Sequence, residues 1–541
     1  MEDSEKSLAE NVTKEPKSNE SKKKKGVIIA IAIVLLVGLV GVVLYFNANK
    51  KANSNEDNNA NKGEVKRENP YSAYTLTNND IADFDLYFLQ LENNSQNEVY
   101  SPLSIKYALA MLNEGSANTS KEQITNILEK YDIKKYTNSR NMSFANAMFI
   151  KNSYKSSIQT SYLDSLKKYN LDVVYDSFQT PTVLNNWVKN KTFNLIDNLY
   201  DDISSNDFIL TNALAIDMDW INKIQSEDDS YVVDFAHENY SKYIHGLNFS
   251  DFYGLDFEGY SKKAKAVEIG AVVNRYDILN TLGEDNVKKT VTDEYNKWVA
   301  VGSENACGFD GYPDEADKLN IDKYLKEIDE NYMTIKSSTD FSFYTDDDVK
   351  VFAKDLKTYN GTTLEYVGIM PKNEKLSDYI KNINAKKVNS LIKSLKSVSL
   401  NNFKDGVITE IHGYIPLFKF DYKLNLVSDL NKLGITDVFD ESKADLSNLT
   451  NDKAYISDAT HKANIEFSND GIKAGAATSV YGAGAGNCGF DYLFDVPVEK
   501  IDLTFDKPYM FIVRDKNSGE VWFTGTVYEP IEYQAKDLEA N

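Results

Sequence analysis

Four histidines are the natural starting point in a search for catalytic or metal chemistry in this chain of 541 residues. None belongs to an H-E-x-x-H pair, the spacing that places two zinc ligands on one face of a helix. The sequence also lacks a G-x-S-x-G nucleophile turn and a G-x-x-x-x-G-K-[ST] phosphate loop. A triad assembled only by folding would leave no such pattern, so an enzyme is disfavoured rather than excluded. We therefore predict no catalytic residue, no metal and no cofactor. The four histidines are His237, His245, His412 and His461.

A glycine-rich segment near the C-terminus carries the spacing G-x-G-x-x-G at Gly484, Gly486 and Gly489. This spacing binds dinucleotides when a helix begins at the third glycine and directs its N-terminus at the pyrophosphate. Residues 490–499 contain Pro497 and have no helical periodicity. We therefore predict no dinucleotide site here.

Just before these glycines lies a stretch of small residues, GIKAGAATSV, at positions 471–480. Alternate side chains of a strand share one face, and from Ile472 onward one such face is uncharged and could be buried, whereas Lys473 falls on the other face. The uncharged face comprises Ile472, Ala474, Ala476, Thr478 and Val480. On composition alone this stretch is an ordinary linker or a segment able to become a central strand.

Hydrophobic patterning predicts the elements that must position this stretch. Residues 80–91 and 101–112 have apolar positions at helical spacing, and Pro102 suits a first helical turn. Apolar runs at 143–149 and 209–216 are typical of strands buried on both faces, with a helix expected between them at 183–199. Helices early and strands late indicate an α+β fold with large mixed or antiparallel sheets; the late strands are expected at 363–370, 410–418, 463–467, 503–513 and 521–527.

One range does not follow this patterning. Residues 221–335 are charged, aromatic and irregular, and we expect an insertion there, with helices at 291–299 and 321–332.

The N-terminal part predicts a single membrane span. Residues 26–46 are an uncharged apolar run that matches a hydrocarbon core of about 30 Å, and they are too long for the apolar region of a cleaved signal peptide, the alternative. Four lysines at 22–25 against two at 50–51 favour a cytoplasmic tail at 1–25. Residues 47–75 are predicted to be a disordered stalk. We expect a single-pass protein of the cell membrane with its C-terminal domain outside, and the net charge of −22 argues against a nucleic-acid partner.

Several longer motifs follow one another along the chain: NEVYSPLSI at 97–105, GSANTSKEQI at 115–124, LNNWVKNKT at 184–192, LTNALAIDMDW at 210–220, LG at 433–434 with ADLS at 444–447, HKA at 461–463, FDKPY at 505–509 and GTV at 525–527. In this order they resemble the serpin family of protease inhibitors over residues 76–531, apart from the insertion, with 532–541 as a tail. The resemblance implies a serpin-like fold with an exposed C-terminal reactive loop, and together with the predicted span we expect a membrane-anchored, bacterial member.

The resemblance implies an inhibitor of extracellular serine or cysteine proteases, whose target is elastase-like or subtilisin-like. Its loop would be cut and then inserted into the main sheet, a mode of strand addition. Family spacing puts the cut at Ala485-Gly486, with Tyr481, Phe490, Tyr492 and Leu493 as alternatives because the loop is longer than usual. The implied hinge is Gly471, Ile472, Lys473, Ala474, Gly475, Ala476, Ala477 and Thr478. The alternative function is that of a non-inhibitory surface protein used in binding or adhesion.

The resemblance also implies a polar cluster beneath the strands that part, with Trp220 where the loop first enters. The cluster is Ser101, Ser104, Asn212 and His461, and static satisfaction of buried polar groups is its alternative role. The family's Glu–Lys pair near the hinge is absent, because these positions hold Asn469 and Leu417. Cys307 and Cys488 lie in nearly identical contexts, one in the insertion and one in the loop. We hypothesise a disulfide between them.

Overall fold

A computed structural model describes residues 80–128, 131, 133–169, 171–224, 240–247, 252, 254–301, 319–472 and 491–534. The predicted span at 26–46, the hinge after Ile472, the bond Ala485-Gly486 and both cysteines lie outside these residues. Within the described ranges, no helix has the length and hydropathy needed to cross a membrane.

The N-terminal helices confirm the early helical patterning. Ser101 caps α3 (Pro102–Gly115), because its side chain accepts a hydrogen bond from the amide of Ser104 and Pro102 occupies the first turn. Nearly all of α3 is buried, between the strands β4 and β20 on one side and α4 on the other. The other elements of this part are α2 (Asp83–Glu92), β1 (Glu98–Tyr100) and α4 (Asn118–Leu128).

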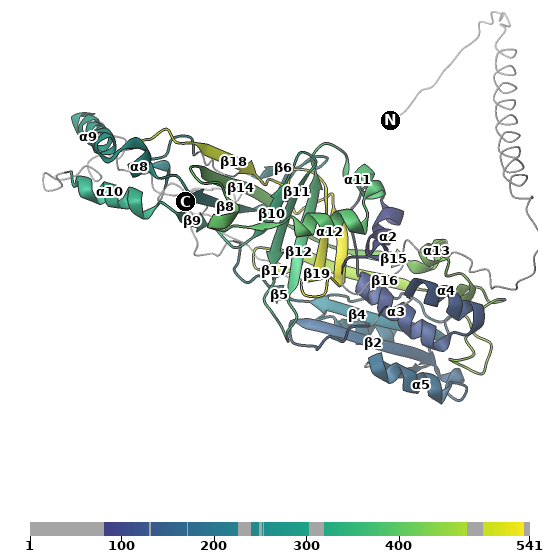
Figure 1. Cartoon of the computed structure of the whole chain (residues 1–541). Helices are drawn as coiled ribbons and strands as arrows, with labels where there is room; N and C mark the ends of the chain where they lie inside the picture. The colour runs from purple at the N-terminus through teal and green to yellow at the C-terminus, as the bar shows by residue number, and fades with distance from the viewer. Residues whose placement is uncertain are drawn as a thin grey trace, which may run out of the picture. The chain divides into compact units, whose positions relative to one another are not determined.

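The centre of the fold is a seven-stranded antiparallel sheet in the order β1-β20-β19-β12-β11-β10-β13 (Figure 1). Its middle strands are buried almost throughout, as expected for continuous apolar runs. The strands are β10 (Ser342–Thr345), β11 (Val349–Asp355), β12 (Leu364–Pro371), β13 (Lys396–Ser397), β19 (Tyr509–Asp515) and β20 (Val521–Val527).

A four-stranded sheet in the order β18-β14-β8-β9 contains part of the range predicted as an insertion. β8 (Ala266–Asn274) is buried at every position and pairs with β14 along its whole length, so it belongs to the core sheet. Three helices lie between β8 and β9 and belong to a separate hydrophobic cluster: α8 (Ile278–Leu282), α9 (Glu284–Val301) and α10 (Ile321–Glu330). The partner strands are β9 (Thr334–Ser337), β14 (Ile408–Pro416) and β18 (Val498–Asp502).

Two further sheets contain β4 and β5, two strands that are neighbours in the sequence. One is β3-β2-β4 and the other is β15-β16-β17-β5. The strands are β2 (Met142–Lys151), β3 (Leu171–Asp176), β4 (Phe208–Ile216), β5 (Met218–Asp219), β15 (Phe418–Asn425), β16 (Thr460–Phe467) and β17 (Gly471–Ile472). A small hairpin joins β6 (Leu255–Asp256) to β7 (Lys263–Ala264).

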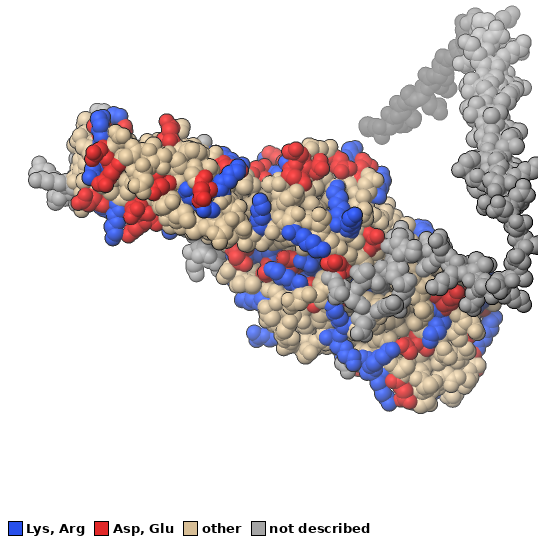
Figure 2. Space-filling model, in the orientation of Figure 1, with Lys and Arg blue, Asp and Glu red and all other residues tan. Residues whose placement is uncertain are grey.

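Short helices cover the sheets. α6 (Thr182–Lys191) is shorter than the predicted 183–199, because Phe193 and Asn194 adopt left-handed backbone angles that end it. The others are α5 (Thr160–Leu166), α11 (Leu376–Asn382), α12 (Ala385–Lys393) and α13 (Leu426–Lys432). Acidic and basic side chains are interspersed over the face drawn in Figure 2.

Candidate functional site

The first two residues of the predicted hinge form β17, which lies between β16 and β5. Ile472 pairs with Phe467 of β16 and with Met218 of β5. β5 continues the direction of β4 after a single intervening residue, yet β4 and β16 belong to different sheets. The space between β4 and β16, called the gap below, is therefore bridged at one end by two hinge residues, and farther along none of the described residues pairs across it.

Gly471 is required by this close approach of backbones. A Cβ added there would lie 2.0 Å from the carbonyl oxygen of Met218, far inside any normal contact. The chain reaches this position through a tight turn, in which the Ser468 hydroxyl donates to the carbonyl of Gly471 at 3.0 Å. Only glycine fits at the start of β17.

Trp220 lies directly against the hinge, so the structure brings these two predicted features together. The indole is fully buried and its Nε1 donates to the carbonyl of Ser468 at 3.0 Å. The amide of Trp220 also donates to the carbonyl of Asp470 at 2.8 Å. Its ring packs edge-on against Phe467, with the centroids 5.5 Å apart. These contacts hold the end of β16 and the turn that leads into the hinge.

The gap contains a cavity of about 20 Å³, room for about one water molecule. A strand inserted there would need its two neighbours about 9.5 Å apart, so β4 and β16 must separate to admit one. Two buried polar atoms in the lining, Thr211 Oγ1 and Asn212 Oδ1, accept no hydrogen bond within the described residues. The cavity is lined by Val188, Ile196, Leu199, Thr211, Asn212, Ala213, Thr460, His461 and Lys462.

Three members of the predicted polar cluster form a chain of hydrogen bonds. The amide of Ser101 donates to His461 Nε2 at 2.9 Å, and the amide of Ser104 donates to Ser101 Oγ at 3.1 Å. Burial lowers the pKa of His461 to about 4, so the imidazole is neutral and Nε2 can accept. Asn212 lines the same cavity, but its amide donates to Asn146 Oδ1 of β2 at 2.6 Å instead.

Ion pairs from other positions surround the hinge where the family's Glu–Lys pair is absent. Leu417 is buried, and the carbonyl of Asn469 accepts from the amide of Ile224 at 3.1 Å. Lys223 pairs with Asp470 at 2.7 Å, one residue before the hinge glycine. Across the neighbouring strands, Lys419 pairs with the buried carboxylate of Glu466 at 3.0 Å. Two ion pairs at other positions therefore lie beside the hinge.

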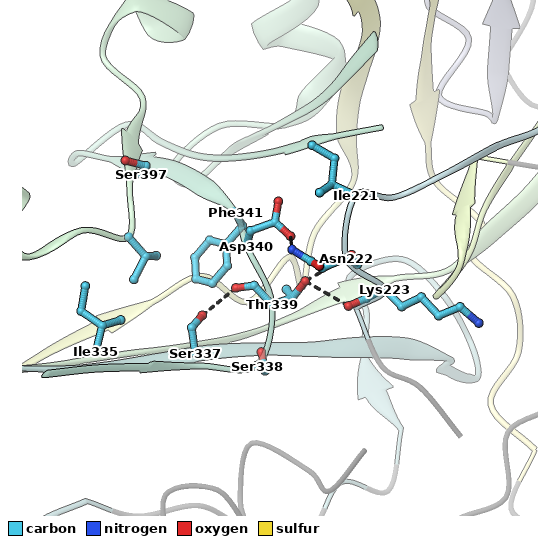
Figure 3. A pocket seen from close by; sticks show the side chains of 11 residues that line it. Ile221, Asn222, Lys223, Ile335, Ser337, Ser338, Thr339, Asp340, Phe341 and Ser397 are labelled. Carbon is cyan, nitrogen blue, oxygen red and sulfur yellow. Dashed lines mark hydrogen bonds between the residues drawn. The ribbon is translucent and has the colours of Figure 1, made fainter. Parts of the chain in front are cut away.

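A buried lysine lies beneath Trp220. Lys354 Nζ is 6.0 Å from the Trp220 ring centroid and donates to Thr339 Oγ1 at 2.8 Å and to Asp340 Oδ1 at 2.9 Å. Burial lowers the pKa of Lys354, although Asp340 opposes the shift. Figure 3 shows Asn222 pointing at Asp340, to which it donates at 2.9 Å, while Lys223 points away. Asn222, Thr339 and Asp340, but not Lys354 or Trp220, line a cavity of about 790 Å³.

Comparison with known families identifies this arrangement. The family model described as Serpin (serine protease inhibitor) matches residues 77–268 and 324–530. The chain belongs to the serpin family. Serpins are generally protease inhibitors without enzymatic activity of their own, and residues 269–323, which include α8 and α9, lie outside the match.

Individual serpins show how far the similarity extends. A serpin-like protein of Methanosarcina acetivorans is 22% identical over 491 residues, 86% of this chain and 89% of that protein. The human leukocyte elastase inhibitor is 36% identical over 122 residues, 22% of this chain and 30% of that protein. Native tengpin, a thermophilic serpin of known structure, aligns with a TM-score of 0.53 and 21% identity, covering 88% of this chain and 97% of tengpin. These relatives do not test the expected bacterial origin, which stays a prediction.

Sequence reasoning missed the charged residues of this serpin's hinge region. Lys354 and Asp340 lie in strands and turns of no special composition, and Lys223 follows Trp220 by three positions. The available signal was two lysines, Lys350 and Lys354, among the apolar residues of strand β11, because a buried lysine needs a polar or charged partner.

Proposed function

We propose that this serpin is a suicide substrate for an extracellular serine or cysteine protease, with Ala485-Gly486 as the bond that is cut. The supporting observation is the position of β17, because two hinge residues already lie between β5 and β16, at the end of a gap that no other described strand fills. The side chain of Ile472 is buried there, as the alternation of the hinge requires. Further residues can continue the strand along the same line.

The chemistry belongs to the protease. Its nucleophile forms an ester or thioester with the carbonyl carbon of Ala485, and the amine of Gly486 leaves with a proton from the protease's general acid. The freed strand then inserts between β4 and β16 and carries the acylated protease with it. Thr211 Oγ1 and Asn212 Oδ1 gain partners as the strand arrives.

Two matched variants of the full-length chain test this mechanism. Ala476→Arg puts a charge on the face predicted to be buried, whereas Ala477→Arg puts the same charge on the other face. We expect wild type and Ala477→Arg to form a denaturant-resistant adduct with an elastase-like or subtilisin-like protease, and Ala476→Arg to be cut without an adduct. Mass spectrometry of the adduct locates the cut. Cleavage of wild type without adduct or heat stabilisation would instead support a non-inhibitory binding or adhesion protein.

We also propose that residues 26–46 anchor the chain in the cell membrane with the C-terminal domain outside. The uncharged run and the lysines before it support this orientation. Resistance of the protein to extraction at alkaline pH, together with protease accessibility on intact cells, is the expected result. Release of the full-length chain by carbonate would contradict the anchor.

The cysteines give a separate proposal, a disulfide between Cys307 and Cys488 that tethers the loop. Their matching contexts and an extracellular location support it. Labelling of denatured, unreduced protein should find no free thiol. Two labelled thiols per chain would contradict the bond.

A further inference from the structure

The three helices that lie between β8 and β9 form a hydrophobic cluster of their own with residues 240–247. We call α8, α9, α10 and residues 240–247 the module. The cluster includes two residues from the far end of the reactive loop, Tyr492 and Phe494, which are 1% and 5% exposed. Its other buried members are Tyr240, Tyr243, Ile244, Leu247, Val272, Tyr276, Ile278, Val287, Val291, Leu325, Ile328 and Ile408.

Backbone and ring contacts hold residues 491–497, the stem of the loop, to the module. The amide of Tyr492 donates to the carbonyl of Lys242 at 3.0 Å, and the amide of Phe494 donates to that of Tyr243 at 2.8 Å. The Tyr492 ring stacks on Tyr243 with centroids 5.9 Å apart and meets Tyr324 of α10 edge-on at 5.4 Å. The module thus holds the stem at Tyr492 and Phe494.

The stem leads into β18, a strand that is weakly held by itself. β18 lies at the edge of its sheet and pairs only with β14 within the described residues. None of its five residues is buried. The pair of Lys404 with Glu499 at 3.5 Å is partly exposed, whereas Asp502 pairs with the buried Lys350 at 2.8 Å. Exposed ion pairs contribute little to stability, so the buried contacts of the stem add to the anchoring at this end.

The outward side of the module is polar. Ion pairs between neighbouring helical turns run along α9 and α10, and Figure 2 shows acidic and basic side chains mixed over this region. The apolar side of the helices faces the cluster that holds Tyr492 and Phe494. The module is therefore organised around the stem.

We propose that the module is a clamp on the stem that prevents the loop from inserting before it is cut, with Tyr243, Tyr324 and Tyr492 as its positioning residues. This inference rests on the proposed function. An uncut loop that inserts along the nine residues of β4 travels about 30 Å. The ten residues then left before Tyr492 must cover about the same distance on their way back, close to their fully extended length of roughly 33–36 Å, so insertion puts tension on the stem. Cleavage before Asp491 removes this connection and leaves the stem in place. The clamp also keeps the backbone at Tyr492 buried, so the cut lies earlier in the loop.

The test compares Tyr492→Ala with Leu493→Ala in the full-length chain. Leu493 is the matched control, because it is the next residue but is 43% exposed. In Tyr492→Ala, amide hydrogen exchange of residues 491–502 should accelerate roughly a hundredfold, with no change in Leu493→Ala. Incubated warm without protease, Tyr492→Ala should convert to a heat-stable, loop-inserted form at least about tenfold faster than wild type.

These measurements test the clamp independently of whether the protein inhibits a protease. Faster exchange without faster conversion would overturn the clamp, as would equal behaviour of Tyr492→Ala and Leu493→Ala. If Tyr492→Ala does not fold, Tyr324→Ala removes the same contact from the module and decides the question by the same readouts. Failure of wild type to trap any protease would refute the proposed inhibition, whereas conversion without protease still measures the clamp.

Discussion

Replacement of Gly471 by alanine tests the hinge geometry most directly. The added Cβ would lie 2.0 Å from the carbonyl oxygen of Met218, whereas close carbon–oxygen contacts between strands are about 3.3–3.6 Å. The opposing atom belongs to the backbone, so no change of rotamer relieves the contact. β17 must shift from β5 by roughly 1 Å or leave its position between β5 and β16.

Both responses have a similar energetic size. If β17 left its position, Ile472 would become exposed, and its burial contributes about 2 kcal/mol. The strand hydrogen bonds of β17, worth about 1 kcal/mol each, would also break. If β17 stayed in place, overpacking strain would cost about 1–3 kcal/mol. We expect the free energy of unfolding to fall by about 2–3 kcal/mol in either case.

Urea denaturation of the full-length chain measures this loss, and tryptophan emission distinguishes the two responses. Withdrawal of β17 exposes the indole of Trp220, which is buried against Ser468, and shifts the emission to longer wavelength. Ile472→Val is the control, because it removes one methyl group without a backbone clash and should cost about 1 kcal/mol with unchanged emission. Gly471→Ala protein with the unfolding midpoint and emission of wild type would refute the close-approach reasoning.

Two further predictions concern buried charge. Lys106 is 2.7 Å from both Asp85 and Glu520, and all three side chains are buried, so Lys106→Met should lower the free energy of unfolding by about 3–5 kcal/mol. Adding Asp85→Asn and Glu520→Gln should recover part of the loss in urea denaturation; no recovery would contradict the pairing argument. The pKa of His461 is lowered from 6.5 to about 4, so its unfolded form binds the proton first, and stability present above pH 6.5 is lost as the pH falls toward 4. In His461→Gln, the free energy of unfolding should vary less with pH between pH 4 and 8, by up to about 3 kcal/mol. A wild-type and a variant curve that run parallel over this range would contradict the prediction.

Strongly patterned elements could be predicted from the sequence. The apolar runs that became β12, β19 and β20 are buried on both faces, and Ser101 with Pro102 marks the start of α3. β8 was hidden because its apolar run lies within a charged and aromatic range, where local composition outweighed the nine-residue pattern. Its identity as a core strand depends on pairing with β14, which lies more than 130 positions later.

The sequence alone determined which residues could enter a sheet. Small, uncharged side chains at every second position after Gly471 satisfy the alternation of a strand, and this requirement is local. The family resemblance predicted that Ser101 and His461 lie together. Only the tertiary structure decided that Asn212 bonds to Asn146 instead, that Lys354 lies beneath Trp220, and that the stem is bound to the module. These contacts join residues far apart in the chain, so their partners follow from folding rather than from spacing.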